Sequence, residues 1–204
     1  MAYCDWFMTG ELQKKYHEEW GIPLHDDKMQ FEYISMEVMQ CGLSFITVLK
    51  KRKILRKCFD NFDFDKVALY DEDDVKRIMN TNGMIKAERK IRAIISNAAA
   101  FQKIRDEFGS FSAYLWSFSD NKTILYTGHE NGFIPASNAL SEKISKDLKK
   151  RGFKFTGPVV IYSHLQACGI INDHAAGCPM RKYIIDNYPT VTKRRYGEKG
   201  AAQF

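Results

Sequence analysis

The chain has 204 residues, 45% of them hydrophobic and 13% aromatic, which is enough to bury a core and excludes a disordered or low-complexity protein. Lysine and arginine number 31 against 25 acidic residues, and the net charge of +6 fits either a polyanionic partner or a solvated basic surface. No apolar run reaches the roughly 18 residues that span a bilayer, and the first residues lack a signal-peptide pattern. We therefore expect a cytoplasmic protein with no membrane partner.

The first half of the chain predicts helices. Apolar residues recur at steps of three and four over 31–41, which places them on one helix face, with Asp26 or Asp27 as its cap and Gly42 at its end. Two more helices are expected over 44–62, with the basic residues 50–52 on the solvent side, and over 71–79.

The second half continues in the same way. Apolar spacing predicts helices around 91–101, over 111–118, from Ser137 to Arg151 and after Gly157. Residues 120–137 show little periodicity and are expected to form a loop, either functional or merely connecting. The residues from Pro189 onward are polar and basic and are expected to form a mobile tail. Because few alternating strands are found, we expect an all-α protein.

Four residues from the two ends of the chain form a possible metal site: Cys4, His17, His174 and Cys178. Two thiolates and two imidazoles suit tetrahedral zinc, and four protein ligands leave no open position, so such a site would be structural. The five cysteines are scattered in a chain without an export signal, which favours reduced thiols over disulfides. The alternative is that the histidines are surface or capping residues and the cysteines are buried apolar residues.

A basic helix end and a glycine-bounded turn occupy residues 148–157. A hairpin of this kind turns backbone N–H groups outward at a helix start, where they can hold a DNA phosphate. Gly152 and Gly157 bound the turn, and Lys150, Arg151 and Lys154 add positive charge. The alternative is a plain helix–helix connection with a basic C-terminal cap.

Glu37 lies on or beside the apolar stripe of the first long helix, three residues after Ile34 and four before Cys41. A carboxylate is costly there without a partner, and with Tyr16 and Phe45 nearby it suits a cationic, planar ligand. The alternative is that Glu37 lies at the edge of the stripe and reaches water, as most helical glutamates do.

Several blocks, taken together and in this order, resemble the bacterial 3-methyladenine DNA glycosylase I family from Cys4 to about Pro179. They are CDW at 4–6, Tyr16 and His17 with Trp20 and Gly21, GLSFITVLKKR at 42–52, KKRGFKFTG at 149–157, QACG at 166–169 and NDH at 172–174. The resemblance implies an α-helical fold of the helix-hairpin-helix glycosylase superfamily, with one structural zinc per chain on Cys4, His17, His174 and Cys178. Residues 1–188 would form one glycosylase domain, or two helical subdomains with the pocket between them.

The same resemblance implies an enzyme that flips a methylated adenine out of double-stranded alkylated DNA and hydrolyses its N-glycosidic bond. We expect the protein to act as a monomer. Glu37 would be the catalytic and base-binding carboxylate, and Tyr16, Phe45 and Trp6 the base-binding aromatic residues. Leu43 would be either the wedge that fills the space left by the base or a buried residue at a helix start.

The sequence departs from the family pattern at a few positions. Phe45 replaces the usual tryptophan, Gln13 an expected tyrosine, and His164 an expected aromatic residue such as phenylalanine. Asp173 is a rival catalytic carboxylate and ranks below Glu37, because its neighbour His174 would be held by zinc. The alternative function is a DNA-binding module that holds a structural zinc and binds lesions without hydrolysing the N-glycosidic bond. A zinc hydrolase would need an open metal position.

Overall fold

The computed structural model describes residue 4 and residues 9–194, most of them in helices. Along the chain lie α1 (Glu11–His17), α2 (Asp27–Gln40), α3 (Phe45–Cys58), η2 (Asp60–Phe62), α4 (Phe64–Val67), α5 (Glu72–Asn80), α6 (Glu88–Phe108), α7 (Phe111–Ser117), β1 (Thr123–Tyr126), η3 (His129–Asn131), α8 (Ala139–Lys150), α9 (Pro158–Ala167), α10 (Pro179–Asn187) and β2 (Thr190–Lys193). The expectation of an all-α protein is confirmed in that helices dominate, but β1 and β2 add a small two-stranded sheet that it did not include. None of the described helices combines the length and apolar character that a membrane crossing requires.

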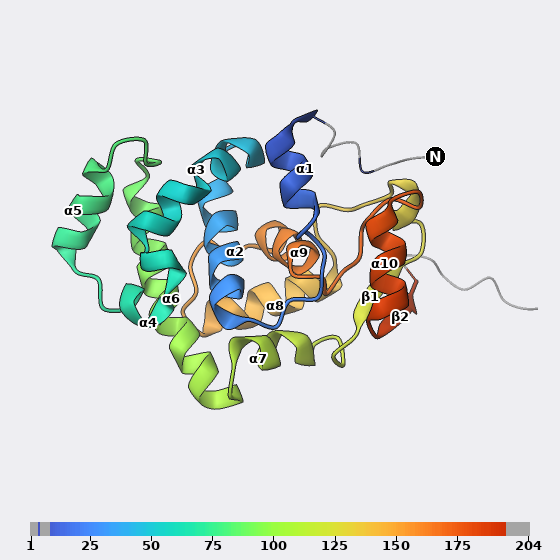
Figure 1. The fold of residues 1–204 in the computed structure, drawn as a ribbon. Helices are drawn as coiled ribbons and strands as arrows, with labels where there is room; N and C mark the ends of the chain where they lie inside the picture. Colours follow the sequence, from blue (N-terminus) through green and yellow to red (C-terminus); the bar gives the residue numbers. More distant parts are fainter. Residues whose placement is uncertain (1–3, 5–8, 195–204) are drawn as a thin grey trace, which may run out of the picture.

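Helix α2 runs through the centre of the molecule, where it packs against α3, α6, α7 and α9 (Figure 1). Of the two expected caps, Asp26 is the one that accepts a hydrogen bond from the backbone N–H of Met29, at 2.7 Å. Asp27 instead accepts the N–H groups of Phe111 and Ser112, at 2.9 and 2.8 Å. This carboxylate therefore fixes the start of α7 against the start of α2.

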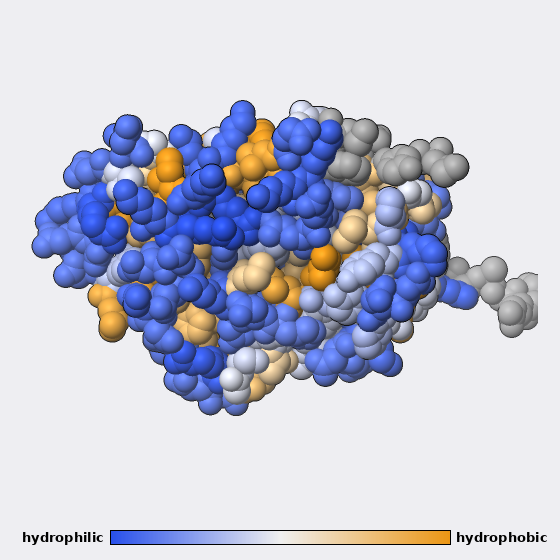
Figure 2. Space-filling model, in the orientation of Figure 1, coloured by the Kyte–Doolittle hydropathy of each residue, from blue (hydrophilic) through white to orange (hydrophobic). Residues whose placement is uncertain are grey.

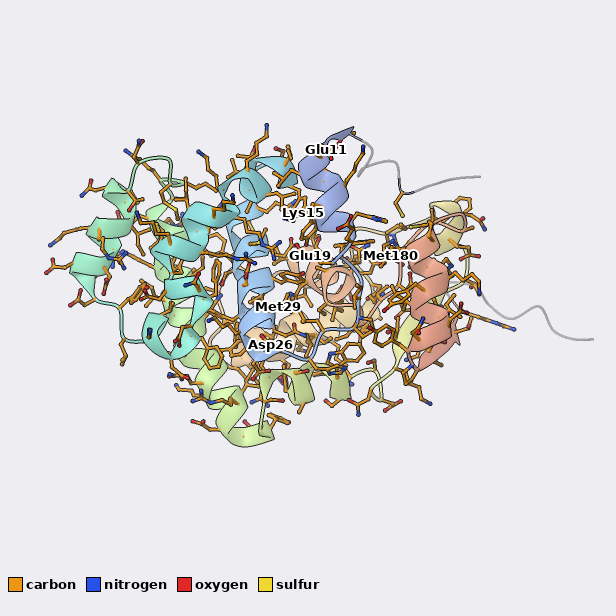
Figure 3. The ribbon with its side chains drawn as sticks, in the orientation of Figure 1. Glu11, Lys15, Glu19, Asp26, Met29 and Met180 are labelled. Carbon is orange, nitrogen blue, oxygen red and sulfur yellow. The ribbon has the colours of Figure 1, made fainter. Side chains whose placement is uncertain are left out.

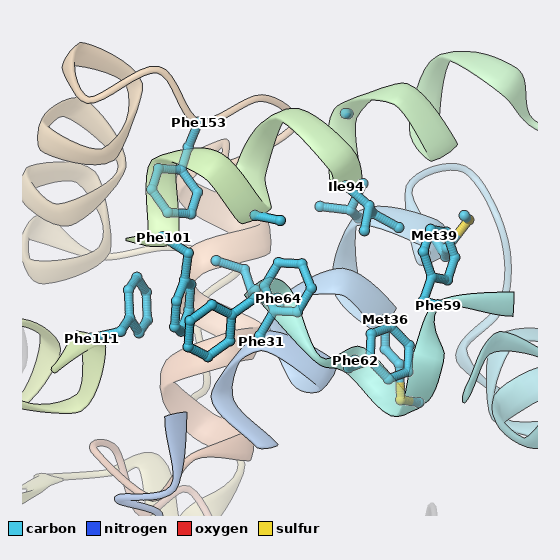
Figure 4. Packing of buried hydrophobic residues seen from close by; sticks show 14 of the residues in the cluster. Phe31, Met36, Met39, Phe59, Phe62, Phe64, Ile94, Phe101, Phe111 and Phe153 are labelled. Atoms are coloured by element: carbon cyan, nitrogen blue, oxygen red, sulfur yellow. The ribbon is translucent and has the colours of Figure 1, made fainter. Parts of the chain in front are cut away.

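The core beside α2 is rich in phenylalanine (Figure 4). The ring of Phe101 stacks on that of Phe111 with centroids 4.0 Å apart, and Phe31 meets Phe101 edge to face at 5.4 Å. These three residues come from α6, α7 and α2, so aromatic packing holds helices that are distant in sequence. The core leaves α2 little freedom to shift, and it thereby gives the residues on α2 a rigid support.

Helix α3 differs from its prediction in two respects. It ends at Cys58, because Asp60, Asn61 and Phe62 adopt positive φ angles and form a separate short turn. Arg52, expected on the solvent side, has a side chain only 13% exposed and points toward α1 and α2. The apolar stripe alone could not reveal this, because acidic partners on other elements draw the arginine inward.

The expected loop over 120–137 contains strand β1, which pairs in parallel with β2, Thr123 lying opposite Thr190. Residues 190–193, assigned from sequence to the start of a mobile tail, therefore form an ordered strand. Their order comes from backbone hydrogen bonds to β1, which local composition does not reveal. The rest of the expected tail, 195–204, lies outside the described residues.

Candidate functional site

A cavity of about 240 Å³ opens between the N-terminal helices and α9. Its lining residues are Tyr16, Trp20, Glu37, Gln40, Phe45, Ser163 and Gln166. Figure 2 shows a mostly hydrophilic face with small apolar areas, one of them where the start of α3 meets α1. This volume lies at the small end of ligand pockets, which suits a single planar ring system rather than an extended chain.

Glu37 is the charged residue among the described residues that line this cavity, and it is only 7% exposed. Its carboxylate forms no hydrogen bond or ion pair with the described part of the chain. Burial raises the pKa of Glu37 to about 8. Glu37 is therefore buried rather than at the exposed edge of its helix, and its carboxylate faces a ligand-sized space without a partner among the described residues.

Two of the predicted aromatic residues form a wall of the same cavity. The rings of Tyr16 and Phe45 lie 4.8 Å apart and are tilted by 49°. Burial, with smaller contributions from Tyr33 and Glu37, raises the pKa of Tyr16, so its hydroxyl stays protonated and can donate a hydrogen bond. Trp6, the third predicted aromatic residue, lies outside the described residues.

Arg52 stabilises the aromatic wall of Tyr16 and Phe45, a role that was not predicted from the sequence. Its guanidinium lies 5.7 Å from the Tyr16 ring centre and 5.6 Å from that of Tyr33. It pairs with Glu19, which Figure 3 shows just beyond α1, and with Glu32 of α2 at 2.5 Å. Arg52 thus holds Tyr16 in place while neutralising two acidic groups, one of them buried.

The four predicted metal ligands come together. Ligand atoms of Cys4, His17, His174 and Cys178 all lie within 4.8 Å of one another, and all four residues are buried. Cys178 Sγ lies 3.4 Å from His17 Nε2 and 3.5 Å from His174 Nδ1. Such spacings match the edges of a tetrahedron around an ion with bonds of about 2.0–2.3 Å. The alternative of surface histidines is wrong.

The surroundings of this cluster suit metal binding. His174 Nε2 lies 3.1 Å from the backbone carbonyl of Trp20, to which it can donate, and this leaves Nδ1 free to bind an ion. Burial, followed by the proximity of His17, lowers the pKa of His174 to about 4, and burial also lowers the pKa of His17. Both imidazoles are therefore neutral at physiological pH, as metal ligands must be.

Helices α8 and α9 form the predicted hairpin. Gly152 has a φ of +93°, a conformation that favours glycine, and Gly157 precedes the first turn of α9. Asn97 of α6 fixes the turn by accepting from the N–H of Lys154 at 2.7 Å and donating to its carbonyl at 3.0 Å. The side chains of Lys150 and Lys154 are exposed.

Arg151 differs from these two lysines, because its guanidinium pairs with Asp147 at 2.7 Å and with Glu107 at 2.6 Å. It also lies over the rings of Phe108 and Tyr114. These contacts join α8 to α6 and α7. A DNA contact by Arg151 would compete with them, and its assignment to DNA stays a prediction.

Leu43 projects from the turn between α2 and α3 and is 39% exposed, so the alternative of a buried residue at a helix start is wrong. The side chain of Lys90 in α6 stabilises this turn by donating hydrogen bonds to the backbone carbonyls of Met39 at 2.8 Å and Cys41 at 2.5 Å. Gly42 has a φ of +75°, which lets the chain reverse before α3. The turn is held by these hydrogen bonds and presents an apolar tip.

The rival carboxylate, Asp173, is 3% exposed and fully engaged. One oxygen accepts from the Tyr162 hydroxyl at 2.6 Å and from Gln166 Nε2 at 2.8 Å, and the other lies 2.7 Å from His129 Nδ1. His129, which sequence reasoning did not single out, comes from the expected loop over 120–137. No periodic pattern surrounds it, so only the fold reveals its partner.

The departures at positions 13 and 164 lie in α1 and α9. Gln13 donates to the Thr9 hydroxyl at 2.9 Å on α1. His164 is completely buried in α9, and neither ring nitrogen has a hydrogen-bond partner among the described residues. Burial lowers its pKa to about 3, so a neutral imidazole stands where an apolar aromatic residue such as phenylalanine was expected.

A ring-sized cavity with aromatic walls and a carboxylate unpartnered among the described residues suits a flipped base, and a turn with exposed lysines suits DNA phosphates, as a DNA glycosylase requires. A family model described as methyladenine glycosylase matches residues 6–182. The chain belongs to this family.

Named relatives agree with this assignment. The chain is 44% identical over 179 residues to DNA-3-methyladenine glycosylase 1 of Escherichia coli (strain K12), covering 87% of this chain and 96% of that protein. It is 37% identical to the DNA-3-methyladenine glycosylase of Haemophilus influenzae, covering 87% and 97%.

Solved structures show the same fold. A crystal structure of 3-methyladenine DNA glycosylase I superposes with a TM-score of 0.82 at 44% identity, covering 87% of this chain and 98% of that one. The crystal structure of a tyrosine-to-phenylalanine variant of 3-methyladenine DNA glycosylase I in complex with 3-methyladenine superposes with a TM-score of 0.83 at 33% identity. The match covers 89% of this chain and 98% of that one.

Proposed function

We propose that this protein is a base-excision repair enzyme that hydrolyses the N-glycosidic bond of 3-methyladenine in alkylated double-stranded DNA, leaving an abasic site. The observation that carries the proposal is the unpaired, buried carboxylate of Glu37 in an aromatic cavity. Membership of the methyladenine glycosylase family and the relatives' names give the reaction.

The substrate base fits the chemistry of the cavity. Methylation at N3 makes the adenine ring in DNA cationic, and a cation is attracted to the faces of aromatic rings such as Tyr16 and Phe45. The Glu37 carboxylate opposes the positive charge and accepts a hydrogen bond from the exocyclic amine. Trp6 would add a further face to the pocket, as the family resemblance implies.

The cationic base is a good leaving group, so the enzyme need not protonate it. The C–N bond breaks as the base leaves with the bonding electron pair, and the sugar acquires oxocarbenium character that water then quenches. A negative charge held close to the base and sugar stabilises the cationic character shared between them. Of the two candidate carboxylates we assign this role to Glu37, because Asp173 already accepts from three protein groups.

The fold supports the expected grip on DNA. We assign the α8–α9 turn to the helix-hairpin-helix class, with the N–H groups around Gly152 and Gly157 and the side chains of Lys150 and Lys154 binding phosphates. Leu43, exposed on its turn, would enter the space that the flipped base leaves. Unstacking costs least at a damaged base, which favours flipping of the lesion.

Zinc fits the cluster of Cys4, His17, His174 and Cys178 in ligand type and in spacing. When bound, it would crosslink the N-terminal segment to the segment before α10 and would take no part in the chemistry, because the four ligands complete a tetrahedron. The gain in stability comes from closing a chain loop that spans nearly the whole protein. We propose one structural zinc per monomer.

The decisive experiment measures free 3-methyladenine released by the purified protein from duplex DNA treated with a methylating agent. We expect release in proportion to enzyme in the early phase, with an abasic site left for each base. Tight binding to methylated DNA with no base released would instead identify a lesion-binding module.

A further inference from the structure

The orientation of the Gln166 side chain is fixed by chemistry. Its Nε2 donates at 2.8 Å to Asp173 Oδ2, which also accepts from the Tyr162 hydroxyl, so a reversed amide would place its oxygen against an oxygen that is already an acceptor. The amide oxygen, Oε1, receives no hydrogen bond from the described residues. Because Gln166 lines the cavity, that oxygen is the polar group it can offer to a ligand.

The carboxylate that orients Gln166 is itself immobilised. Tyr162 donates to the same oxygen at 2.6 Å, and His129 Nδ1 lies 2.7 Å from the other. His129 is 3% exposed and sits between Gly128 and Gly132, both with positive φ, so the backbone is shaped to bury this ring. Because both oxygens of Asp173 already take part in hydrogen bonds, rotation of its carboxylate would break at least one of them. Likewise, a flip of the Gln166 amide would break its hydrogen bond to Asp173.

An acceptor fixed in this way distinguishes adenine from guanine. Adenine carries an exocyclic amine, which donates, where guanine carries a carbonyl oxygen, which accepts. Glu37 cannot make this distinction alone, because burial raises the pKa of its carboxyl to about 8, and a protonated carboxyl can donate to a carbonyl. An amide held with its oxygen inward cannot.

We propose that Gln166 is a specificity-determining residue whose Oε1 accepts from the exocyclic amine of the flipped base. Asp173, His129 and Tyr162 are the positioning residues that hold it in the accepting orientation. The proposal rests on the function proposed above and adds a second polar contact to the base, independent of Glu37. Pairing two accepting groups with one amine excludes the methylated guanines that the same alkylating agents produce.

The test compares Gln166→Met with Gln40→Met. Methionine keeps the length of the side chain and removes the acceptor, and Gln40 lines the same cavity without a partner on Asp173. The rates of 3-methyladenine and 3-methylguanine release are measured under single-turnover conditions on one methylated duplex. We expect Gln166→Met to lower the ratio of the two rates about tenfold, the loss of one hydrogen bond, and Gln40→Met to change it less than about twofold.

The positioning network has its own test. His129→Leu removes the donor to Asp173, whereas the side-chain amide of His129→Asn can place a donor near the position of Nδ1. We expect the leucine variant to lower the same ratio and the asparagine variant to restore most of it, with Tyr162→Phe serving if the leucine variant does not fold. Thermal unfolding separates these effects from a loss of folded protein.

Each outcome decides one question. If the unmodified protein releases no 3-methyladenine, the proposed function fails. If it does release the base and Gln166→Met leaves the ratio unchanged, or Gln40→Met changes it equally, the assignment of Gln166 is wrong while the function stands. Where 3-methylguanine release is too slow to measure, calorimetric binding of the two free bases replaces the rates, and equal weakening of both by Gln166→Met overturns the proposal.

Discussion

Replacing Glu37 by glutamine removes a charge from the cavity and leaves its shape unchanged. Among the described residues the carboxylate has no partner, so the substitution breaks no hydrogen bond with them. A charge-assisted hydrogen bond to a cationic base contributes about 1.5–3 kcal/mol. Because about 1.4 kcal/mol corresponds to a factor of ten, we expect base release by Glu37→Gln to fall roughly tenfold to a few hundredfold.

The pH dependence sharpens this prediction. The pKa of about 8 means that Glu37 in the empty cavity holds its proton below that pH, and binding of a cation must then displace it. The second-order rate of base release by the unmodified enzyme should rise about tenfold per pH unit up to roughly pH 8 and level off above it. The Glu37→Gln enzyme should show no such rise. Single-turnover release between pH 6 and 9 measures both profiles.

Folding stability should respond in the opposite sense. The pKa of Glu37 is higher in the folded state, about 8, than its ordinary value of 4.5, so the folded state binds the proton more tightly. Ionisation therefore costs stability as pH rises from about 4.5 to 8, by at most about 5 kcal/mol at 1.36 kcal/mol per unit. The glutamine variant lacks this penalty, so it should match the parent near pH 4.5 and be more stable near pH 8.

Denaturant unfolding of both proteins at the two pH values measures this difference. A glutamine variant with the parent's rate and the parent's pH profile would refute the catalytic assignment of Glu37. A variant less stable than the parent at pH 8 would show that the carboxylate has a structural partner, and the reasoning from burial would then be wrong.

Three further predictions concern the rest of the molecule. Cys178→Ser should lower the melting temperature and reduce the zinc content below one ion per chain, whereas Cys41→Ser, outside the cluster, should keep one zinc ion. A metal-free protein with an unchanged melting temperature would contradict the site. Lys150→Ala and Lys154→Ala should each reduce the slope of log binding constant against log salt concentration for undamaged duplex by about one unit. An unchanged slope when both lysines are replaced would show that the hairpin does not bind the phosphates. Arg52→Met should destabilise the fold by about 1.5–3 kcal/mol, because the buried Glu32 would lose its less exposed arginine partner and keep only Arg56. Denaturant unfolding compares this variant with Arg56→Met, the more exposed partner, and equal losses in the two variants would contradict the reasoning.

The sequence predicted the features that depend on periodicity and on recognisable blocks. Helix α2, its cap at Asp26, the cluster of four metal ligands and the turn at Gly152 were all anticipated. Local pattern predicts such features because one helix face or one tight turn leaves its own signature. Family resemblance added the pairing of the two chain ends, which spacing alone left open.

The features that escaped prediction depend on contacts between distant segments. Arg52 was placed in solvent because its acidic partners lie on other elements, and strand β2 was hidden in a polar tail because its partner strand is far away in sequence. His129 stands in a stretch without periodicity, and its role follows only from its contact with Asp173. Polar networks of this kind form between segments that are distant in sequence, so the local residue pattern does not reveal them.

The position of Trp20 makes the protein its own optical probe. Its indole lines the base cavity, its ring lies 4.7 Å from the ring of His174, and its carbonyl can accept from that histidine. Of the two other tryptophans in the chain, Trp116 is buried in the core, and Trp6→Phe would remove the remaining one. In that background, fluorescence quenching by a base in the cavity and by metal exchange at His174 would both report through Trp20, with Trp116 as an internal standard for intensity.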